Sequence, residues 1–316
     1  MVCPEYHATR HSSRLDDVKL VYKHASRLVR RVPPPWPRAG KGRPPKFSAR
    51  RHAAICITAR CLDLTYREVE GQAPFFLRET VDHSTIGWAL KRMGVNYVKL
   101  LLALLRRELQ RLVRVEFYTV DTTGISTPRL KRRVKAFRRL WEREFLKLHA
   151  LVGYSRRASA LFVVASRVTK SNVTDGSQLG YLLRGLRVRG EPLLADAAYH
   201  SKRNLELAVE HGFKPVIKPR SYGYHGLFWK RTLREFKRAH GLYRSRGIAE
   251  AVFAGLANRY HSHTRYKRGR TKTTSILLML VAHNLRTLVR VRAMKRMGIL
   301  FIQWIYSTNP TMPKNF

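Results

Sequence analysis

Acidic residues are scarce in this chain of 316 residues, which has 20 Asp and Glu against 63 Lys and Arg and a formal net charge of +43. Two of these acids follow apolar, strand-like runs: Asp121 ends the run 117–121, and Asp196 follows Leu193, Leu194 and Ala195. An acid at the end of a buried strand is costly unless a positive group binds beside it. We therefore consider both residues candidate ligands of a divalent cation.

Cysteine is also scarce. The three cysteines, Cys3, Cys56 and Cys61, form an odd count without a CxxC pair, so the sequence predicts neither a disulfide framework nor a zinc site. They are expected to be core thiols. The histidine pair His261 and His263 lies in a basic segment, and we expect it to contact phosphate or solvent rather than a metal.

Long apolar runs are absent, since none approaches the ~18–20 residues that span a bilayer. The first residues lack the layout of a signal peptide. The sequence thus predicts a cytoplasmic, nucleoid-associated protein with no membrane contact. The pI near 11.3 favours nucleic acid as the partner, because binding phosphates releases counterions. A membrane-surface protein is the rival interpretation of the same charge.

The first half of the chain is expected to hold a basic, Pro-rich arm or linker at 1–45 and a helical domain at 46–115. Helix signals occur at 48–61, at a capping box from Thr65 to Glu68, and at a polar start from Asp82. Three short helices of this kind are typical of a helix-turn-helix, whose last helix enters the major groove of DNA. A plain three-helix domain is the alternative.

From residue 116 the pattern changes to α/β. Strands are predicted at 117–121, 148–154, 161–167 and 192–196, followed by a helix and a short strand at 214–219. Three strands in succession, then alternating helices and strands, indicate a ribonuclease-H-like mixed sheet flanked by helices. We assign 116–292 to this catalytic domain and 293–316 to a C-terminal tail of unknown role.

A metal site at Asp121 and Asp196 requires a third oxygen ligand. After His211 the chain has only two acids, Glu235 and Glu250. Nearby arginines can pair Glu235 along a helix, whereas small apolar residues follow Glu250, which favours a buried carboxylate. Glu250 is therefore the predicted third ligand.

Six segments resemble, in the same order, the DDE transposases of prokaryotic insertion sequences (IS4/IS5-type superfamily), over roughly residues 46 to 290. They are TVDTTGIS around Asp121, KLH at 147–149, VTKSNVTDGSQL at 168–179, LLADAAYHS around Asp196, VIKPR at 216–220, and the pattern from Tyr243 through Arg246 to Glu250. The family pattern continues to a Lys seven residues after the Glu. This chain has Ala257 there, and we expect Arg259 to substitute for that Lys.

The resemblance implies a metal-dependent enzyme that cleaves and transfers DNA strands. Asp121, Asp196 and Glu250 would hold two Mg²⁺ ions, replaceable by Mn²⁺, ~3.5–4 Å apart. The partners would be double-stranded DNA, as transposon ends and target, and a second copy of the chain in a homodimer. The residues expected to contact DNA are Tyr243, Arg246, Arg259, Arg132, Arg133, Lys135, Lys267, Arg268 and Arg270.

Other interpretations of the same residues stay open. Asp121 suits a turn, Asp196 suits a helix N-cap, and Arg246 with Glu250 suits a surface pair at i,i+4. The basic runs 129–139 and 260–272 suit a solvated face as well as a phosphate-binding one. At the level of function, the alternatives are a transposase-derived DNA-binding protein with weakened or lost catalysis, and a ribonuclease-H-like nuclease.

Overall fold

The computed structural model describes residues 18–37, 45–135, 138–220, 226–260, 264, 266 and 269–297, without the side chains of 129–143. The chain forms two compact units, of which unit 1 comprises Met1–Leu105 and Tyr266–Arg290, and unit 2 comprises Arg106–Arg265 and Val291–Phe316. Residues 266–290 thus cluster with the N-terminal part of the chain, although the sequence placed them in the catalytic domain. Almost all of the tail from 293 lies outside the described residues.

Unit 1 is helical. Its helices are α2 (Val18–Arg30), α3 (Ala49–Cys61), α4 (Tyr66–Leu77), α5 (His83–Arg92), the first part of α6 (Val95–Leu112) and most of α12 (Gly269–Arg296). The expectation of an unpacked arm over 1–45 is wrong for α2, which buries Val21, Ala25, Leu28 and Val29. These residues recur at helical spacing, but basic and Pro-rich neighbours hid the pattern.

The predicted helix starts of unit 1 are confirmed at residue level. Thr65 and Glu68 form a reciprocal capping box at α4, and the side chain of Asp82 accepts a hydrogen bond from the N–H of Ser84 at the start of α5. Along α5, Ile86, Ala89 and Leu90 are buried. Three helices therefore stand where a helix-turn-helix was expected, and their recognition of DNA stays a prediction.

Helix α12 is long and apolar enough, on length and composition, to cross a membrane, so the prediction that no segment approaches this length is wrong. In the structure 78% of its most apolar window is buried. Within unit 1, Thr274 of α12 donates a hydrogen bond to the carbonyl of Met93 (3.4 Å), and Arg286 donates to the carbonyl of Cys61 (3.1 Å). Helix α12 therefore has the burial of a core helix.

Unit 2 contains a five-stranded mixed sheet of order β3-β2-β1-β4-β5. Its strands are β1 (Phe117–Lys135), β2 (Arg138–Ser155), β3 (Ala160–Lys170), β4 (Pro192–Ala195) and β5 (Lys214–Ile217). The first three are antiparallel neighbours, whereas β4 pairs in parallel with both β1 and β5. A mixed sheet of this kind, flanked by helices, fits a ribonuclease-H-like domain, as the sequence predicted.

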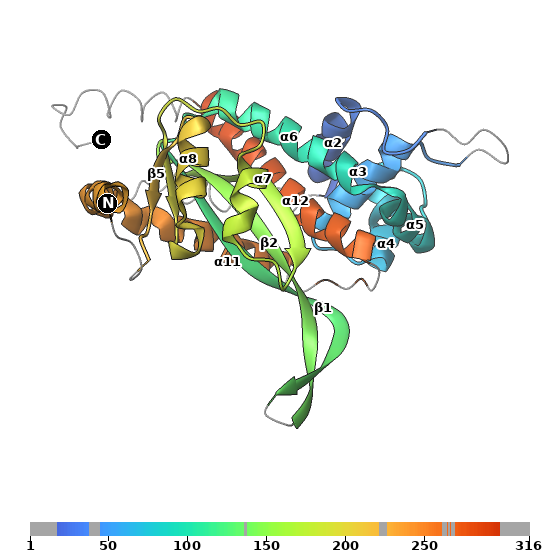
Figure 1. Ribbon diagram of the computed structural model, residues 1–316. Coiled ribbons are helices and arrows are strands. Elements are labelled where there is room, and N and C mark those ends of the chain that lie inside the picture. Colours follow the sequence, from blue (N-terminus) through green and yellow to red (C-terminus); the bar gives the residue numbers. More distant parts are fainter. Residues whose placement is uncertain are drawn as a thin grey trace, which may run out of the picture. The chain divides into compact units, whose positions relative to one another are not determined.

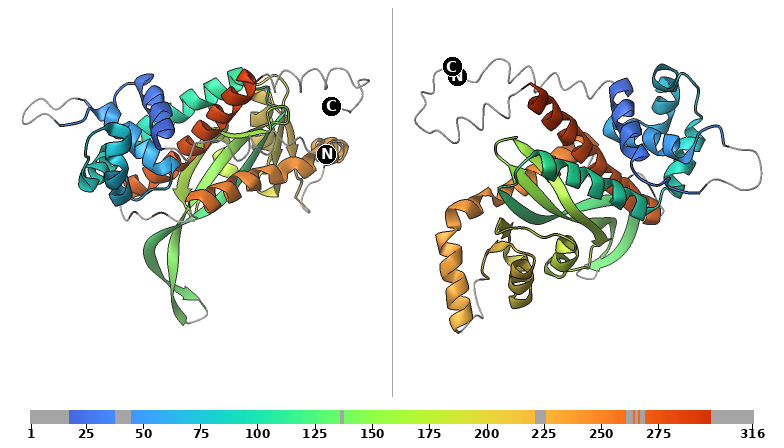
Figure 2. Two further views of the ribbon diagram at one scale, coloured as in Figure 1. Left: turned by 180° about the vertical axis from the view of Figure 1, so that it is seen from behind. Right: turned by 90° about the horizontal axis from the view of Figure 1, so that it is seen from above.

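Helices cover both faces of this sheet. Helix α7 (Leu179–Leu183) and α8 (Lys202–Glu210) lie on one face and α11 (Ile248–Tyr260) on the other (Figures 1 and 2). The remaining elements of unit 2 are η1 (Gly176–Gln178), η2 (Ala197–Tyr199), α9 (Leu227–Arg238), α10 (His240–Tyr243) and η3 (Arg244–Gly247). Helix α11 packs against β1, so it approaches the strand that carries Asp121.

Strands β1 and β2 continue far beyond the shared sheet as a two-stranded hairpin (Figure 1). Pairing runs from Phe117 with Tyr154 to Lys135 with Arg138, with an irregularity between Ser126 and Leu130. The prediction that the first strand ends at Asp121 is therefore wrong. Asp121 lies within β1, close to the point where pairing with β4 stops.

Candidate active site

Strand register places Asp121 and Asp196 side by side. Thr119 of β1 pairs in parallel with Leu194 of β4, and each acid stands two residues after its member of this pair. Because side chains alternate between faces with a period of two, both acids share a sheet face with Thr119 and Leu194. The hydroxyl of Thr119 donates to the carbonyl of Arg246 (3.4 Å), so this face is the one that the Arg246 segment covers.

Arg246 connects two of the three predicted acids. Its Nη1 lies 3.2 Å from Oδ2 of Asp121, and its Nη2 lies 3.2 Å from Oε1 of Glu250. Arg246 lies in η3 and Glu250 in the first turn of α11, so helical spacing brings the pair together. The pair at i,i+4 that the sequence left open as an alternative is therefore present, and it extends to Asp121.

Burial raises the pKa of the Asp121 carboxyl above its ordinary value, and the charges of Asp196 and Glu250 add to this rise. The backbone N–H of Thr122 and the Arg246 guanidinium oppose it. Burial likewise raises the pKa of Tyr243, and the charges of Asp196 and Asp121 add to this rise. The hydrogen bond and the charge of Arg246 oppose it. These mutual effects indicate that five groups form one electrostatic cluster: Asp121 of β1, Asp196 directly after β4, Tyr243 of α10, Arg246 of η3 and Glu250 of α11.

The opposite face of β1 carries a hydrogen-bonded network directly beside Asp121. The hydroxyl of Thr122 lies 2.8 Å from Nδ1 of His149, and Nε2 of His149 lies 2.8 Å from the hydroxyl of Thr169. The Tyr199 hydroxyl lies 3.1 Å from that of Thr122. Because His149 is fully buried, this network fixes the backbone of β1 where Asp121 emerges.

A second set of contacts holds the loop between β3 and α7 against the same strands. Lys147 donates to Oδ1 of Asp175 (2.9 Å) and to the carbonyl of Val173 (3.0 Å). A Cβ at Gly176 would lie 2.4 Å from the carbonyl oxygen of Ala198, so only glycine fits between this loop and η2. Sequence patterns did not reveal the roles of Lys147 and Asp175, because their partners lie on other elements of the fold.

His149 provides a test of this network. Burial lowers the pKa of His149 from 6.5 to about 4. Between these two pH values the imidazole is therefore protonated in the unfolded chain and neutral in the folded chain. Stability should therefore fall as pH drops through this window, by up to about 3 kcal/mol for this one group. We expect His149→Gln to be less stable than the parent at pH 7, with the gap narrowing at pH 4.5 in urea unfolding. A gap of equal size at both values would contradict this assignment.

The carboxylate of Glu250 is not buried, so that part of the prediction is wrong: the side chain is 63% exposed. The reason is its place in the first turn of α11, where Ala249 and Val252 supply the buried contacts. Glu235, the alternative, lies on the exposed helix α9 and pairs with Arg231 (3.0 Å). Of the two glutamates, Glu250 is the one that shares a partner with Asp121.

The other predicted DNA contacts are spread widely. Arg259 is exposed in the last turn of α11. Nine residues at ~100° each place it on the opposite side of the helix from Glu250, whereas Ala257 lies on the Glu250 side. This geometry disfavours Arg259 as the substitute for the Lys. Arg270 is exposed in α12. Outside the described residues or side chains lie Arg132, Arg133, Lys135, Lys267, Arg268, His261 and His263.

The three acids suit a hard cation, because carboxylate oxygens are the ligands that Mg²⁺ prefers. In the described part of the chain, one group of three His, Cys, Asp or Glu ligand atoms lies within 4.8 Å of one another, and it is Glu70, Asp82 and His83 in unit 1. There Asp82 caps α5 and His83 pairs with Glu70 (2.9 Å). At the Asp121 cluster, the Arg246 guanidinium lies between two carboxylates, and a cation would have to replace it.

A family model described as a transposase DDE domain matches residues 116–285, which is more than half of the chain. The match contains Asp121, Asp196 and Glu250. No curated protein matches the chain.

Proposed function

Because the chain belongs to the transposase DDE domain family, we propose that it binds the ends of an insertion sequence of the IS4/IS5 type and cleaves and transfers their strands. The observation that carries this proposal is the convergence of three acids in unit 2: Asp121 and Glu250 share Arg246 as a partner, and the charge of Asp196 acts on Asp121. The register of the parallel strands β1 and β4 places the first two acids side by side. The third comes from a helix packed on the same strand.

We propose that these three acids hold Mg²⁺, with Mn²⁺ as a substitute. Bound ions of this kind activate the attacking oxygen and stabilise the leaving oxygen of a phosphodiester. Arg246 would then be displaced from Asp121 and Glu250, and its guanidinium would be placed to bind a phosphate in bidentate fashion. Tyr243, hydrogen-bonded to Arg246, would orient that guanidinium.

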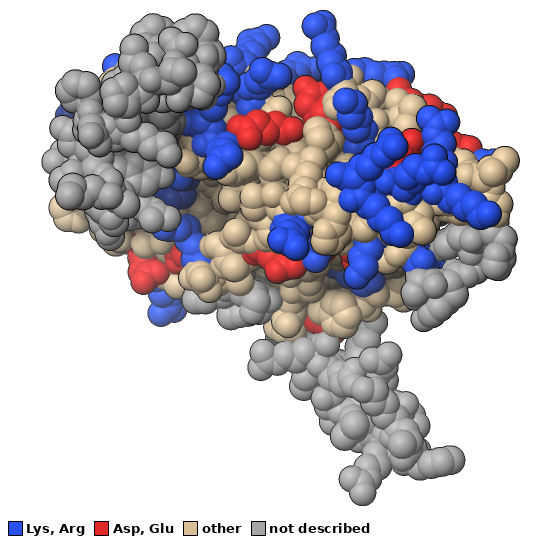
Figure 3. Space-filling view, turned by 90° about the vertical axis from the view of Figure 1, so that its left-hand side faces the viewer, with Lys and Arg blue, Asp and Glu red and all other residues tan. Residues whose placement is uncertain are grey.

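DNA is the partner that the charge favours. On the face drawn in Figure 3, Lys and Arg side chains gather more densely than Asp and Glu, in a chain of net charge +43. We propose that the hairpin of β1 and β2, with its basic sequence between 129 and 139, and the segment around Arg270 track phosphates. A homodimer is the expected assembly, because the described part of one chain offers one such acid cluster and two ends must be joined.

Unit 1 would supply recognition of the ends. Helix α5 buries Ile86, Ala89 and Leu90 and exposes Ser84, Trp88 and Lys91. Exposed polar groups near the start of a last helix are what a helix-turn-helix presents to base edges. We therefore propose that α5 reads the end sequence, while unit 2 holds the backbone.

A transposase-derived protein with weakened catalysis is the second candidate. It is favoured by the face of α11 that bears Glu250, because Ala254 and Ala257 follow there at helical spacing where the family pattern has a Lys. Such a protein would bind the ends and cleave them poorly or not at all.

The test is strand cleavage of a supercoiled plasmid carrying the element's ends, incubated with the protein in Mg²⁺ or in EDTA. We expect nicked or linear products in Mg²⁺ and none in EDTA, and we expect Mn²⁺ to restore cleavage. Specific binding without products in either metal would favour the second candidate. Cleavage that persists in EDTA would contradict a metal-dependent mechanism.

A further inference from the structure

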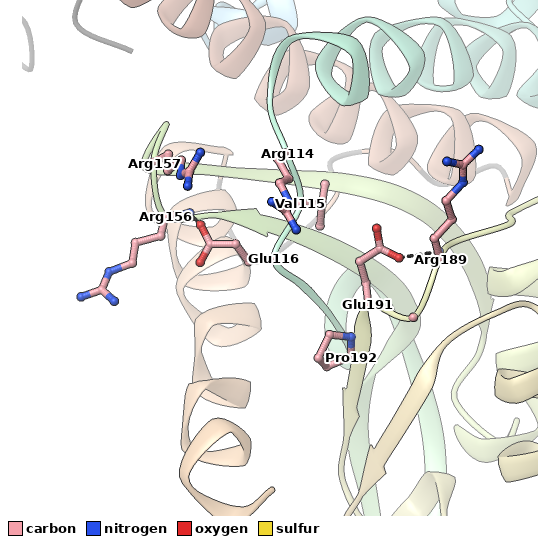
Figure 4. A pocket seen from close by; sticks show the side chains of 9 residues that line it. Arg114, Val115, Glu116, Arg156, Arg157, Arg189, Glu191 and Pro192 are labelled. Carbon is pink, nitrogen blue, oxygen red and sulfur yellow. Dashed lines mark hydrogen bonds between the residues drawn. The ribbon is translucent and has the colours of Figure 1, made fainter. Parts of the chain in front are cut away.

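Unit 2 has a cavity with a volume of about 660 Å³. It lies where β1 and β4 begin, at the opposite end of these strands from the acids. Three connections form it: the segment that leads into β1, the turn between β2 and β3, and the loop before β4 (Figure 4). Its charged lining consists of Arg114, Arg156, Arg157, Arg189, Glu116 and Glu191.

The two glutamates in this cavity have backbone partners. Oε1 of Glu116 accepts the N–H of Arg156 (2.8 Å), and Oε2 of Glu191 accepts the N–H of Arg189 (2.6 Å). Their carboxylates therefore fix the two loops. Within the described part of the chain, none of the four arginines has a carboxylate within ion-pair distance of its guanidinium. Figure 4 shows these arginines distributed along the cavity, from Arg156 and Arg157 at one end to Arg189 at the other.

A fifth cation borders the cavity. A Cβ at Gly190 would lie 3.7 Å from Cε of Lys214, which pairs with Pro192 at the start of β5. This approach shows that the loop that carries Arg189 passes close to the start of β5. Gly190 has a φ of +93°, a conformation suited to glycine. Unpaired guanidiniums and an ammonium around a solvent-open hollow favour an extended anion with several negative groups.

The cavity is too distant to serve the phosphate at the acids. Asp121 follows Glu116 by five positions along β1, and Asp196 follows Pro192 by four positions along β4. At ~3.3 Å per residue in a strand, this distance is roughly 13–17 Å, which is several nucleotide steps. A phosphate in the cavity must therefore belong to another part of the DNA.

We infer that this arginine-lined cavity binds the phosphate backbone of a second stretch of DNA, away from the strand held at Asp121, Asp196 and Glu250. Guanidinium groups bind phosphates in bidentate fashion and stay charged at every physiological pH. The inference rests on the proposed function in one respect, since it takes DNA to be the polyanion that this chain handles.

The experiment measures the affinity of the full chain for duplex DNA by fluorescence anisotropy between 50 and 300 mM salt. Each lost phosphate contact lowers the log–log salt slope by about 0.9. The triple variant Arg114→Gln, Arg157→Gln, Arg189→Gln should lower the slope by about two to three. The converse variant, Glu116→Gln with Glu191→Gln, keeps an acceptor oxygen for each N–H and removes two negative charges, so it should bind DNA more tightly than the parent.

The matched control is Arg184→Gln, Arg187→Gln, Arg203→Gln, which removes the same charge from exposed arginines outside the cavity. A cavity variant that lowers the slope no more than this control overturns the inference. So does a variant that loses affinity for inorganic tripolyphosphate but not for DNA, because the cavity would then take a small polyphosphate. If the parent cleaves DNA in Mg²⁺ and the slope is unchanged, the inference fails alone. If the parent neither binds nor cleaves DNA, both proposals fail.

Discussion

Replacing Asp121 or Asp196 with Ala is expected to reduce Mg²⁺-dependent strand cleavage by a factor on the order of 10³ or more. The reason is geometric, because register brings the two acids side by side at the ends of neighbouring parallel pairings and the charge of Asp196 acts on Asp121. Binding to DNA should stay within about twofold of the parent, since the lost groups are negative and do not hold phosphate. Cleavage is measured on supercoiled donor plasmid, and binding by anisotropy.

Glu206→Ala is the matched control for both variants. Glu206 is an exposed acid of α8 that pairs with Lys202, and its loss should leave cleavage at the parent level. Substantial cleavage by the Asp121 or the Asp196 variant would remove that residue from the metal site. A parallel loss of DNA binding would indicate that the residue supports the fold instead.

Glu250→Gln is expected to be nearly as inactive as the aspartate variants, whereas Glu235→Gln should cost less than about twofold. The two substitutions are chemically identical and differ only in place. Glu250 shares Arg246 with Asp121, while Glu235 pairs with Arg231 on an exposed helix. Rates on the same plasmid in Mg²⁺ give the comparison.

The reversed ranking would move the third ligand from α11 to α9 and end the assignment of the Tyr243, Arg246 and Glu250 motif. Equal, small effects would indicate that Asp121 and Asp196 act without a glutamate. Far-ultraviolet circular dichroism of both variants would establish that neither substitution unfolds the chain.

Sequence patterns predicted most of the sheet in unit 2, because β3, β4 and β5 are apolar runs bounded by turns. Strands β3, β4 and β5 fall close to their predicted positions, and the parallel pairing of β1 with β4 places the two aspartates together as expected. Because acids are scarce, only Glu235 and Glu250 follow His211. Composition alone therefore reduced the candidates for the third metal ligand to two.

Contacts between residues far apart in the chain could not be predicted from sequence patterns. Continuation of β1 past Asp121 depends on cross-strand pairing with β2, and the His149 network joins three strands and η2. Glu250 is exposed because the other side of α11 packs on β1. The apolar residues that follow Glu250 in the sequence did not indicate which side that is. Helix α2 was missed because its small apolar stripe lies among basic residues.

Iron-directed cleavage of the polypeptide would test most directly whether Asp121, Asp196 and Glu250 bind a metal. Fe²⁺ would replace Mg²⁺ in the full chain, ascorbate and peroxide would cut the backbone beside the bound ion, and mass spectrometry would locate the cuts. We predict cuts near residues 121, 196 and 250 that excess Mg²⁺ suppresses and that Asp121→Ala abolishes. Cuts confined to the neighbourhood of Glu70, Asp82 and His83 would contradict the proposed metal site.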